Sequence, residues 1–163
     1  MTTPQRILER AVRRGLHQEQ TTSIPTRLSA AYLRTEFVVD LMPPLVMRVG
    51  KRSARRDRLL TERGHATWAF VTAWNPWSQP RSRLTNQARH RRLRTALARM
   101  GLPCVAGRGR DPRGRWPAEE SFFVMGCSVS EARRLGSVFG QHAVLVGRLG
   151  GRPRLLACAA PAI

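Results

Sequence analysis

The segment from Thr72 to Gln79, with the sequence TAWNPWSQ, carries side chains suited to ligand binding. It follows a run of strand-forming residues and precedes the longest helical pattern, and ligands favour strand ends that face the positive end of a helix dipole. Asn75 offers an amide and Ser78 a hydroxyl, while Trp74 offers a ring that can stack on a flat ligand. The segment predicts a binding site, although Asn-Pro is also a frequent turn signal and tryptophans often cover a core edge.

Catalytic and metal-binding motifs are missing from the sequence. It contains no Gly-rich dinucleotide motif, no phosphate-binding P-loop, no HExxH and no GxSxG. The four histidines lack metal-ligand spacing, and no Cys-x-x-Cys pair exists. The sequence therefore assigns no catalytic residue, no metal site and no cofactor, and it favours a non-enzymatic protein over an enzyme.

The charge of the chain is strongly positive. Its 29 basic residues stand against 10 acidic ones, which gives a net charge of +19, and Lys51 is the single lysine. Nucleic-acid surfaces usually combine Lys and Arg, so this composition is typical of a coding bias toward Arg. Such a charge nevertheless attracts polyanions at low salt. A basic surface without a function is therefore favoured, and nucleic acid remains the less favoured partner.

Localisation is inferred from hydropathy and cysteine usage. The chain has neither a secretory apolar region nor an apolar stretch of the roughly 18 residues that a membrane span needs. Cys104, Cys127 and Cys158 lie far apart, each in or beside an apolar run, and are expected to be reduced core residues. These features predict a cytoplasmic protein without a membrane span.

The first 28 residues are predicted to lie outside the domain. Residues 4–18 show a narrow apolar stripe and predict an amphipathic helix, which is followed by a linker over residues 19–28. This helix is expected to dock on its own domain, with a partner protein or an anionic membrane surface as the alternatives. Residues 29–160 are predicted to form a single α+β domain, which agrees with the chain length of 163 residues.

Apolar patterning and turn signals predict the elements of this domain. Strands are expected at residues 35–40, 45–49, 67–73, 103–107, 121–127, 143–146 and 154–158. Helices are expected at residues 53–62, at residues 82–100 and after the Ser128-x-x-Glu131 capping box. The long helix is expected to bury Leu84, Ala88, Leu93, Ala96, Leu97 and Met100. From residue 67 onward the order predicts a split βαβ (ferredoxin-like) core, extended by the N-terminal hairpin with its short helix and by a C-terminal edge strand.

Several short motifs, in this order, resemble the bacterial domain of unknown function 3293. They are Tyr32-x-x-Thr35-x-Phe37-x-Val39, Arg48-Val49-Gly50 with Leu59-Leu60, Thr72-Ala73-Trp74-Asn75-Pro76-x-Ser78, Asn86, Trp116-x-x-Glu119-Glu120-Ser121-Phe122 and Phe139-Gly140-Gln141. The similarity spans about residues 31–147. It implies a compact α/β domain in the cytoplasm, and it implies no reaction.

The polar residues of this resemblance are grouped at loops, and they predict a pocket for a small anionic or nucleotide-like ligand. The predicted ligand-binding residues are Trp74, Asn75, Ser78, Asn86, Arg89, Glu120, Ser121 and Gln141. Among them Glu120 is the one acid or base and Arg89 an anion clamp. Local roles compete with this hypothesis, since Asn86 can cap a helix and Gln141 can bond a turn. The alternative functions are a basic nucleic-acid-binding module and a protein-interaction module.

Overall fold

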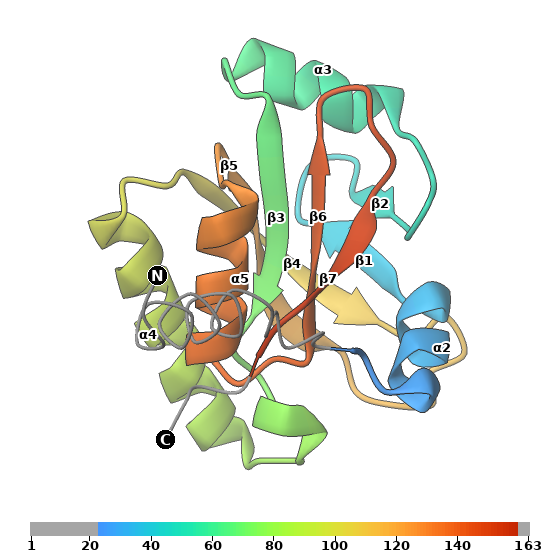
Figure 1. Cartoon of the computed structure of the whole chain (residues 1–163), viewed down its shortest axis with the longest axis vertical. Coiled ribbons are helices and arrows are strands. Elements are labelled where there is room, and N and C mark those ends of the chain that lie inside the picture. Colours follow the sequence, from blue (N-terminus) through green and yellow to red (C-terminus); the bar gives the residue numbers. More distant parts are fainter. Residues whose placement is uncertain (1–22, 160–163) are drawn as a thin grey trace, which may run out of the picture.

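A seven-stranded antiparallel sheet forms the centre of the computed structural model, which describes residues 23–159 (Figure 1). The strand order is β2-β1-β4-β5-β3-β6-β7. The strands are β1 (Glu36–Val39), β2 (Leu45–Met47), β3 (Thr67–Thr72), β4 (Cys104–Arg110), β5 (Glu119–Met125), β6 (Ala143–Arg148) and β7 (Arg154–Ala157). The helices are α2 (Thr26–Arg34), α3 (Ala54–Glu62), α4 (Arg83–Arg99) and α5 (Val129–Val138), with a 3-10 turn η1 (Pro76–Ser78). The predicted α+β class is confirmed.

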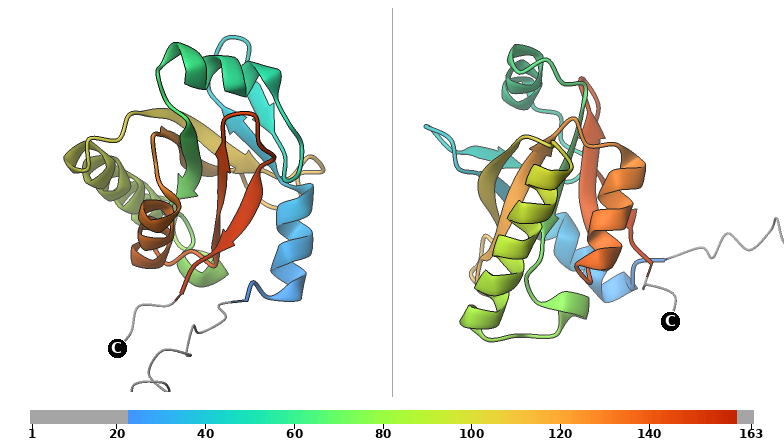
Figure 2. Two further views of the ribbon diagram at one scale, coloured as in Figure 1. Left: turned by 45° about the horizontal axis from the view of Figure 1, so that its top comes forward. Right: turned by 90° about the vertical axis from the view of Figure 1, so that its left-hand side faces the viewer.

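Both faces of the sheet are covered, because alternate residues of the inner strands are apolar on both sides. In β3, Ala69 and Val71 belong to a core cluster that also contains Leu93 and Leu97 of α4. Its other face, with Phe70, belongs to a second cluster with residues of β1, α3 and β5. Helices α4 and α5 lie side by side over the first cluster (Figure 2). The sheet is therefore a central layer with helices packed on each face.

Serine caps start three of the helices, as the sequence patterns indicate. The side chains of Ser53, Ser82 and Ser128 each accept a hydrogen bond from the backbone N–H three residues later. At Ser128 the capping box is complete, because the Glu131 carboxylate accepts from the Ser128 N–H at 2.8 Å. Local sequence therefore determines where α3, α4 and α5 begin.

Helix α2 corrects one prediction. Residues 26–28, which were assigned to a linker, are the first residues of this helix. It follows Pro25, and no side chain caps it. Tyr32 of α2 packs against the second core cluster. Because the usual local start signals are missing, α2 depends on its contacts with the sheet.

The buried side of α4 also differs from the prediction. Leu84 is 79% exposed and Met100 is exposed as well, whereas Asn86, Leu93 and Leu97 are buried. Leu84 precedes Leu93 by nine residues, which places the two on opposite sides of a helix with 3.6 residues per turn. The buried face therefore continues through Asn86 at its N-terminal end, and this amide takes the place of an apolar residue.

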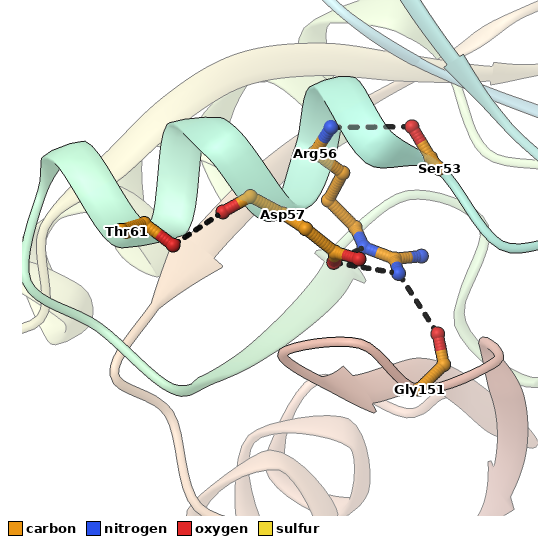
Figure 3. A network of polar contacts seen from close by, with 5 residues as sticks. All are labelled: Ser53, Arg56, Asp57, Thr61 and Gly151. Carbon is orange, nitrogen blue, oxygen red and sulfur yellow. Dashed lines mark hydrogen bonds and ion pairs between the residues drawn. The ribbon is translucent and has the colours of Figure 1, made fainter.

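A buried arginine ties α3 to the turn between β6 and β7 (Figure 3). The Arg56 side chain is fully buried, and it donates to Asp57 Oδ1 at 2.9 Å and to the carbonyl of Gly151 at 2.8 Å. Its guanidinium also lies over the Trp68 ring, 5.1 Å from the centroid. A group with two hydrogen-bond partners and an aromatic face joins elements about 95 residues apart.

The cysteines are free, as predicted: Cys127 and Cys158 are buried and Cys104 is half-buried. Burial raises the pKa of the Cys127 thiol to about 12 and that of Cys158 to about 11. Within residues 23–159, no helix combines the length and the hydropathy required to cross a bilayer. The helix predicted over residues 4–18 lies outside the described residues.

Candidate functional site

A cleft of about 880 Å³ opens where several inner strands of the sheet begin or end, beside helix α2. Its walls come from the end of β3, the start of β5, the start of β6 and the end of β4, together with the loop that leads into α4. The floor is apolar and includes Phe37, Phe70 and Leu145, which belong to the second core cluster. The cleft therefore lies on the face of the sheet that α2 and α3 cover, at the C-terminal end of the central strand β3.

Seven of the eight predicted site residues line this cleft. They are Trp74, Asn75, Ser78, Asn86, Glu120, Ser121 and Gln141. The eighth, Arg89, does not line it and is described below. Segments separated by more than 60 residues thus meet around one hollow, but lining a hollow does not by itself leave a side chain free for a ligand.

The Asn75 and Asn86 side chains bond mainly to each other and to the backbone. Asn86 Oδ1 accepts from the Asn75 N–H, and Asn86 Nδ2 donates to Asn75 Oδ1, both at 2.9 Å. Asn86 Nδ2 also donates to the Arg81 carbonyl at 3.3 Å, and Asn86 is only 2% exposed. Both amide hydrogens of Asn86 are therefore used within the protein, and its side chain holds the wall of the cleft in place.

The loop held by this pair has a strained backbone. Asn75, Trp77 and Ser78 have positive φ values of 44°, 56° and 58°. Asn tolerates this region, but for Trp and Ser it costs of order 1 kcal/mol each. The loop is fixed by contacts with the α5–β6 turn: the Trp77 N–H donates to the Gly140 carbonyl at 2.6 Å, and a Cβ at Gly140 would meet Pro76 at 2.7 Å. Strain held in place by surrounding contacts is a feature of binding sites.

Arg89 and Gln141 brace the same loop from two further elements. Arg89 donates to the carbonyls of Ala73 and Phe139, at 2.7 and 2.6 Å. Gln141 Nε2 donates to the carbonyls of Trp74 and Phe139, at 3.0 and 3.2 Å. These bonds hold the loop between β3, α4 and the α5–β6 turn. Residues 71–144, which contain all of them, match a protein family.

That family is described as protein of unknown function (DUF3293). The resemblance found in the sequence is therefore confirmed over residues 71–144, a narrower range than the predicted 31–147. The DUF3293 match includes Asn75, Asn86, Arg89 and Gln141, and it ends at the second residue of β6, before β7. No curated protein and no solved structure matches the chain. The matched segment thus contains the braced loop and its supports, but the family description assigns no reaction to them.

Within the DUF3293 match, Glu119 is the carboxyl group held in the cleft. Its Oε1 accepts from Asn75 Nδ2 at 2.7 Å. Burial raises the pKa of Glu119, and the hydrogen bond from Asn75 opposes this shift. Burial also raises the pKa of Tyr32 on α2 to about 12, and the negative charge of Glu119 adds to that shift. Glu119 and Tyr32 therefore place an acidic group and a neutral hydroxyl on the two sides of the cleft.

The predicted acid, Glu120, also borders the cleft, but its carboxylate lies on the opposite face of β5, beside His90 of α4. Its carboxylate lies 4.0 Å from His90 Nε2, and its side chain is half exposed. His90 stacks on Phe122, with ring centroids 4.3 Å apart, and burial lowers its pKa. His90 is therefore a partly buried ring that packs on β5. Because neighbouring residues of a strand point to opposite faces, Glu119 and Ser121 share one face of β5 and Glu120 points to the other.

Sequence reasoning missed Glu119, Tyr32 and the arginines at the cleft rim. The rim contains Arg81, Arg83 and Arg108, and Trp116 adds a second indole beside Trp74. Both Tyr32 and Glu119 were within the motifs of the resemblance. The alternation of β5 was the available signal for Glu119, since Ser121 was already a predicted site residue. Between residues 23 and 159, no three His, Cys, Asp or Glu side chains gather where they could hold a metal ion.

Proposed function

We propose that this protein binds a small anionic, nucleotide-like ligand in the cleft at the TAWNP loop. The observation that carries the proposal is the chemistry of the cleft. An apolar and aromatic floor is combined with arginines at the rim and a hydrogen-bonded carboxyl in the wall. A cleft of about 880 Å³ is within the range of small-molecule sites.

Different parts of the cleft suit different parts of such a ligand. Trp74 and Trp116 offer flat surfaces for a planar ring. The guanidinium groups of Arg81 and Arg83 suit a phosphate or carboxylate, since their planar donor forks match these anions. Glu119 can accept hydrogen bonds from amino or hydroxyl groups, through the carboxylate oxygen that Asn75 does not use. The ligand's negative group is therefore expected at the rim, away from Glu119.

A thermal-shift panel tests this proposal. Wild-type protein is heated with AMP, ATP, GTP, CTP, UTP and NAD at 150 mM KCl, so that nonspecific attraction to the basic surface is screened. At 100 times its dissociation constant a ligand stabilises the fold by about 2.7 kcal/mol, which a melting curve detects readily. Binding is confirmed by titration calorimetry.

The matched variants compare two pairs of exposed arginines. The double variant R81Q/R83Q removes two charges at the rim and is expected to lose the ligand-induced shift. The double variant R52Q/R58Q removes two exposed arginines on or beside α3 and is expected to keep it. The proposal fails if no compound of the panel raises the melting temperature, or if both double variants respond equally.

We also infer the finer architecture that places this cleft. The order β4-β5-β3-β6, with every neighbouring pair antiparallel, supports a split βαβ (ferredoxin-like) core extended by β1 and β2 at one edge and β7 at the other. One continuous sheet from β1 to β7 supports a single domain over residues 29–160, with α2 beginning shortly before it. Three free thiols support the reducing conditions of the cytoplasm.

A further inference from the structure

The opposite face of the sheet carries a second hollow with a different chemistry. It lies between α4 and the C-terminal end of α5 and has a volume of about 590 Å³. Four arginines line it, namely Arg89, Arg91, Arg92 and Arg99. No acidic residue lines it. We call this hollow the arginine groove.

Positive charge is concentrated along the helices that form the groove. Helix α4 contains six arginines and no acidic residue, and α5 adds Arg133 and Arg134. The one carboxylate of α5, Glu131, accepts from the Ser128 N–H in the capping box. Arg91, Arg92 and Arg99 are exposed to solvent. The two helices therefore present a positively charged surface.

Some arginines outside α4 and α5 are paired with carboxylates, whereas no arginine of these two helices is, within the residues that the structure describes. In the described part of the chain, the arginines with a carboxylate partner are Arg48, Arg56, Arg108, Arg110 and Arg115. None of these belongs to α4 or α5. Burial lowers the pKa of Arg89, and the like charges of Arg92 and Arg81 lower it further. Among residues 23–159, no carboxylate lies within 4.0 Å of a guanidinium group of α4 or α5.

The shape and composition of the groove point to a nucleic-acid backbone. Guanidinium groups bind phosphate oxygens through paired donors, and helices hold them in fixed rows. Single-strand binding usually adds aromatic side chains on which bases stack, but Phe139, the one aromatic residue of the groove, is 8% exposed. Because the described residues of the groove offer no surface on which bases could stack, the groove is better suited to the phosphates of a duplex than to a single strand. Insertion into a membrane would require a continuous apolar face, and the exposed side of α4 is rich in arginine instead.

We propose that the arginine groove binds the phosphate backbone of duplex nucleic acid without sequence preference. This inference is independent of the ligand proposed for the cleft, because the two sites lie on opposite faces of the sheet. Arg89 lines the arginine groove and does not line the cleft. Its guanidinium donates to the carbonyls of Ala73 and Phe139.

Fluorescence anisotropy with a labelled 20-base-pair DNA duplex tests the proposal on the full chain, over 50 to 300 mM KCl. The triple variant R91Q/R92Q/R99Q removes three groove charges. The control R52Q/R58Q/R63Q removes three exposed charges on and around α3, at the far end of the molecule (Figure 1). Glutamine preserves helix propensity, and urea unfolding of both variants verifies that the fold is intact.

At 100 mM KCl, the groove variant is expected to bind the duplex at least about tenfold more weakly, and the control less than about threefold. The slope of log K against log salt is expected to be smaller in magnitude by about 2–3 in the groove variant. Each lost phosphate contact lowers the magnitude of this slope by about 0.9. Equal losses in the two variants would assign binding to diffuse charge and overturn the proposal. So would undetectable binding of the wild type at 50 mM KCl, or tighter binding to anionic phosphatidylglycerol vesicles than to the duplex.

Discussion

The cleft and the arginine groove lie on opposite faces of one sheet, and they differ in how far their polar side chains are hydrogen-bonded or ion-paired within the protein. In the cleft, Asn75 and Asn86 are bonded to each other and to the backbone, and Glu119 is held by an amide. In the groove, Arg91 and Arg92 face solvent without a carboxylate partner among the described residues. Polar groups in the cleft are therefore largely used by the fold itself, whereas those of the groove have few partners within the described part of the protein.

The largest loss of stability is expected from Asn86→Ala in the wall of the cleft. This substitution removes the acceptor of the Asn75 N–H and the donor to Asn75 Oδ1, and it is expected to lower the free energy of unfolding by about 2 kcal/mol. Urea unfolding measures the change. The control is Gln87→Ala on the next, half-buried position, which is expected to stay within about 0.5 kcal/mol. Equal costs at the two positions would show that the amide pair does not support the fold.

Arg89 tests the boundary between the two regions. Arg89→Met keeps the aliphatic part of the side chain but removes the bonds to the Ala73 and Phe139 carbonyls, so a loss of about 1 kcal/mol is expected. Arg92→Met, also in the groove, is expected to change stability by less than about 0.5 kcal/mol. If the two variants unfold at the same urea concentration, Arg89 belongs with the solvent-facing arginines and the comparison must be redrawn.

The smallest effect is expected from Glu119→Gln, and it depends on pH. The pKa of Glu119 is raised in the folded state, so its contribution to stability is fully present below its ordinary pKa and is lost as pH rises through the folded-state pKa. Glutamine stays neutral and still accepts from Asn75. The variant is therefore expected to melt higher than wild type at pH 8, with the gain vanishing near pH 4. Melting curves at both pH values decide, and a gain that is independent of pH would contradict the assignment.

Local patterns predicted most of the elements correctly. The strands at β3 and β5 and the starts of α3, α4 and α5 follow from apolar runs and serine caps, which act over a few residues. Helix α2 was missed because it has no side-chain cap and no buried residue of its own, so only contact with the sheet stabilises it. The exposure of Leu84 was missed because an amide, Asn86, occupies the buried face. In both cases tertiary contacts override local preference.

The residues named from the sequence lie mostly around one cleft, but their hydrogen-bond partners were not predicted. The grouping of seven predicted residues around one cleft follows the motifs of the DUF3293 match. The choice of Glu120 over Glu119 depended on which face of β5 each residue occupies. That is set by pairing with β3, where Ser121 lies opposite Thr72, and a shift of one residue would exchange the two carboxyls.

What the sequence by itself determined are the element positions, the helix caps, the segment that forms the loop and the excess of arginine, because each depends on residue types close together in the chain. Tertiary structure alone decided which polar groups are already satisfied, which carboxyl faces the cleft, and which arginines lack a carboxylate among the described residues. These properties depend on distances between segments such as β3, α4 and the α5–β6 turn, and hydrogen bonds and ion pairs form only when folding brings such segments within about 3–4 Å.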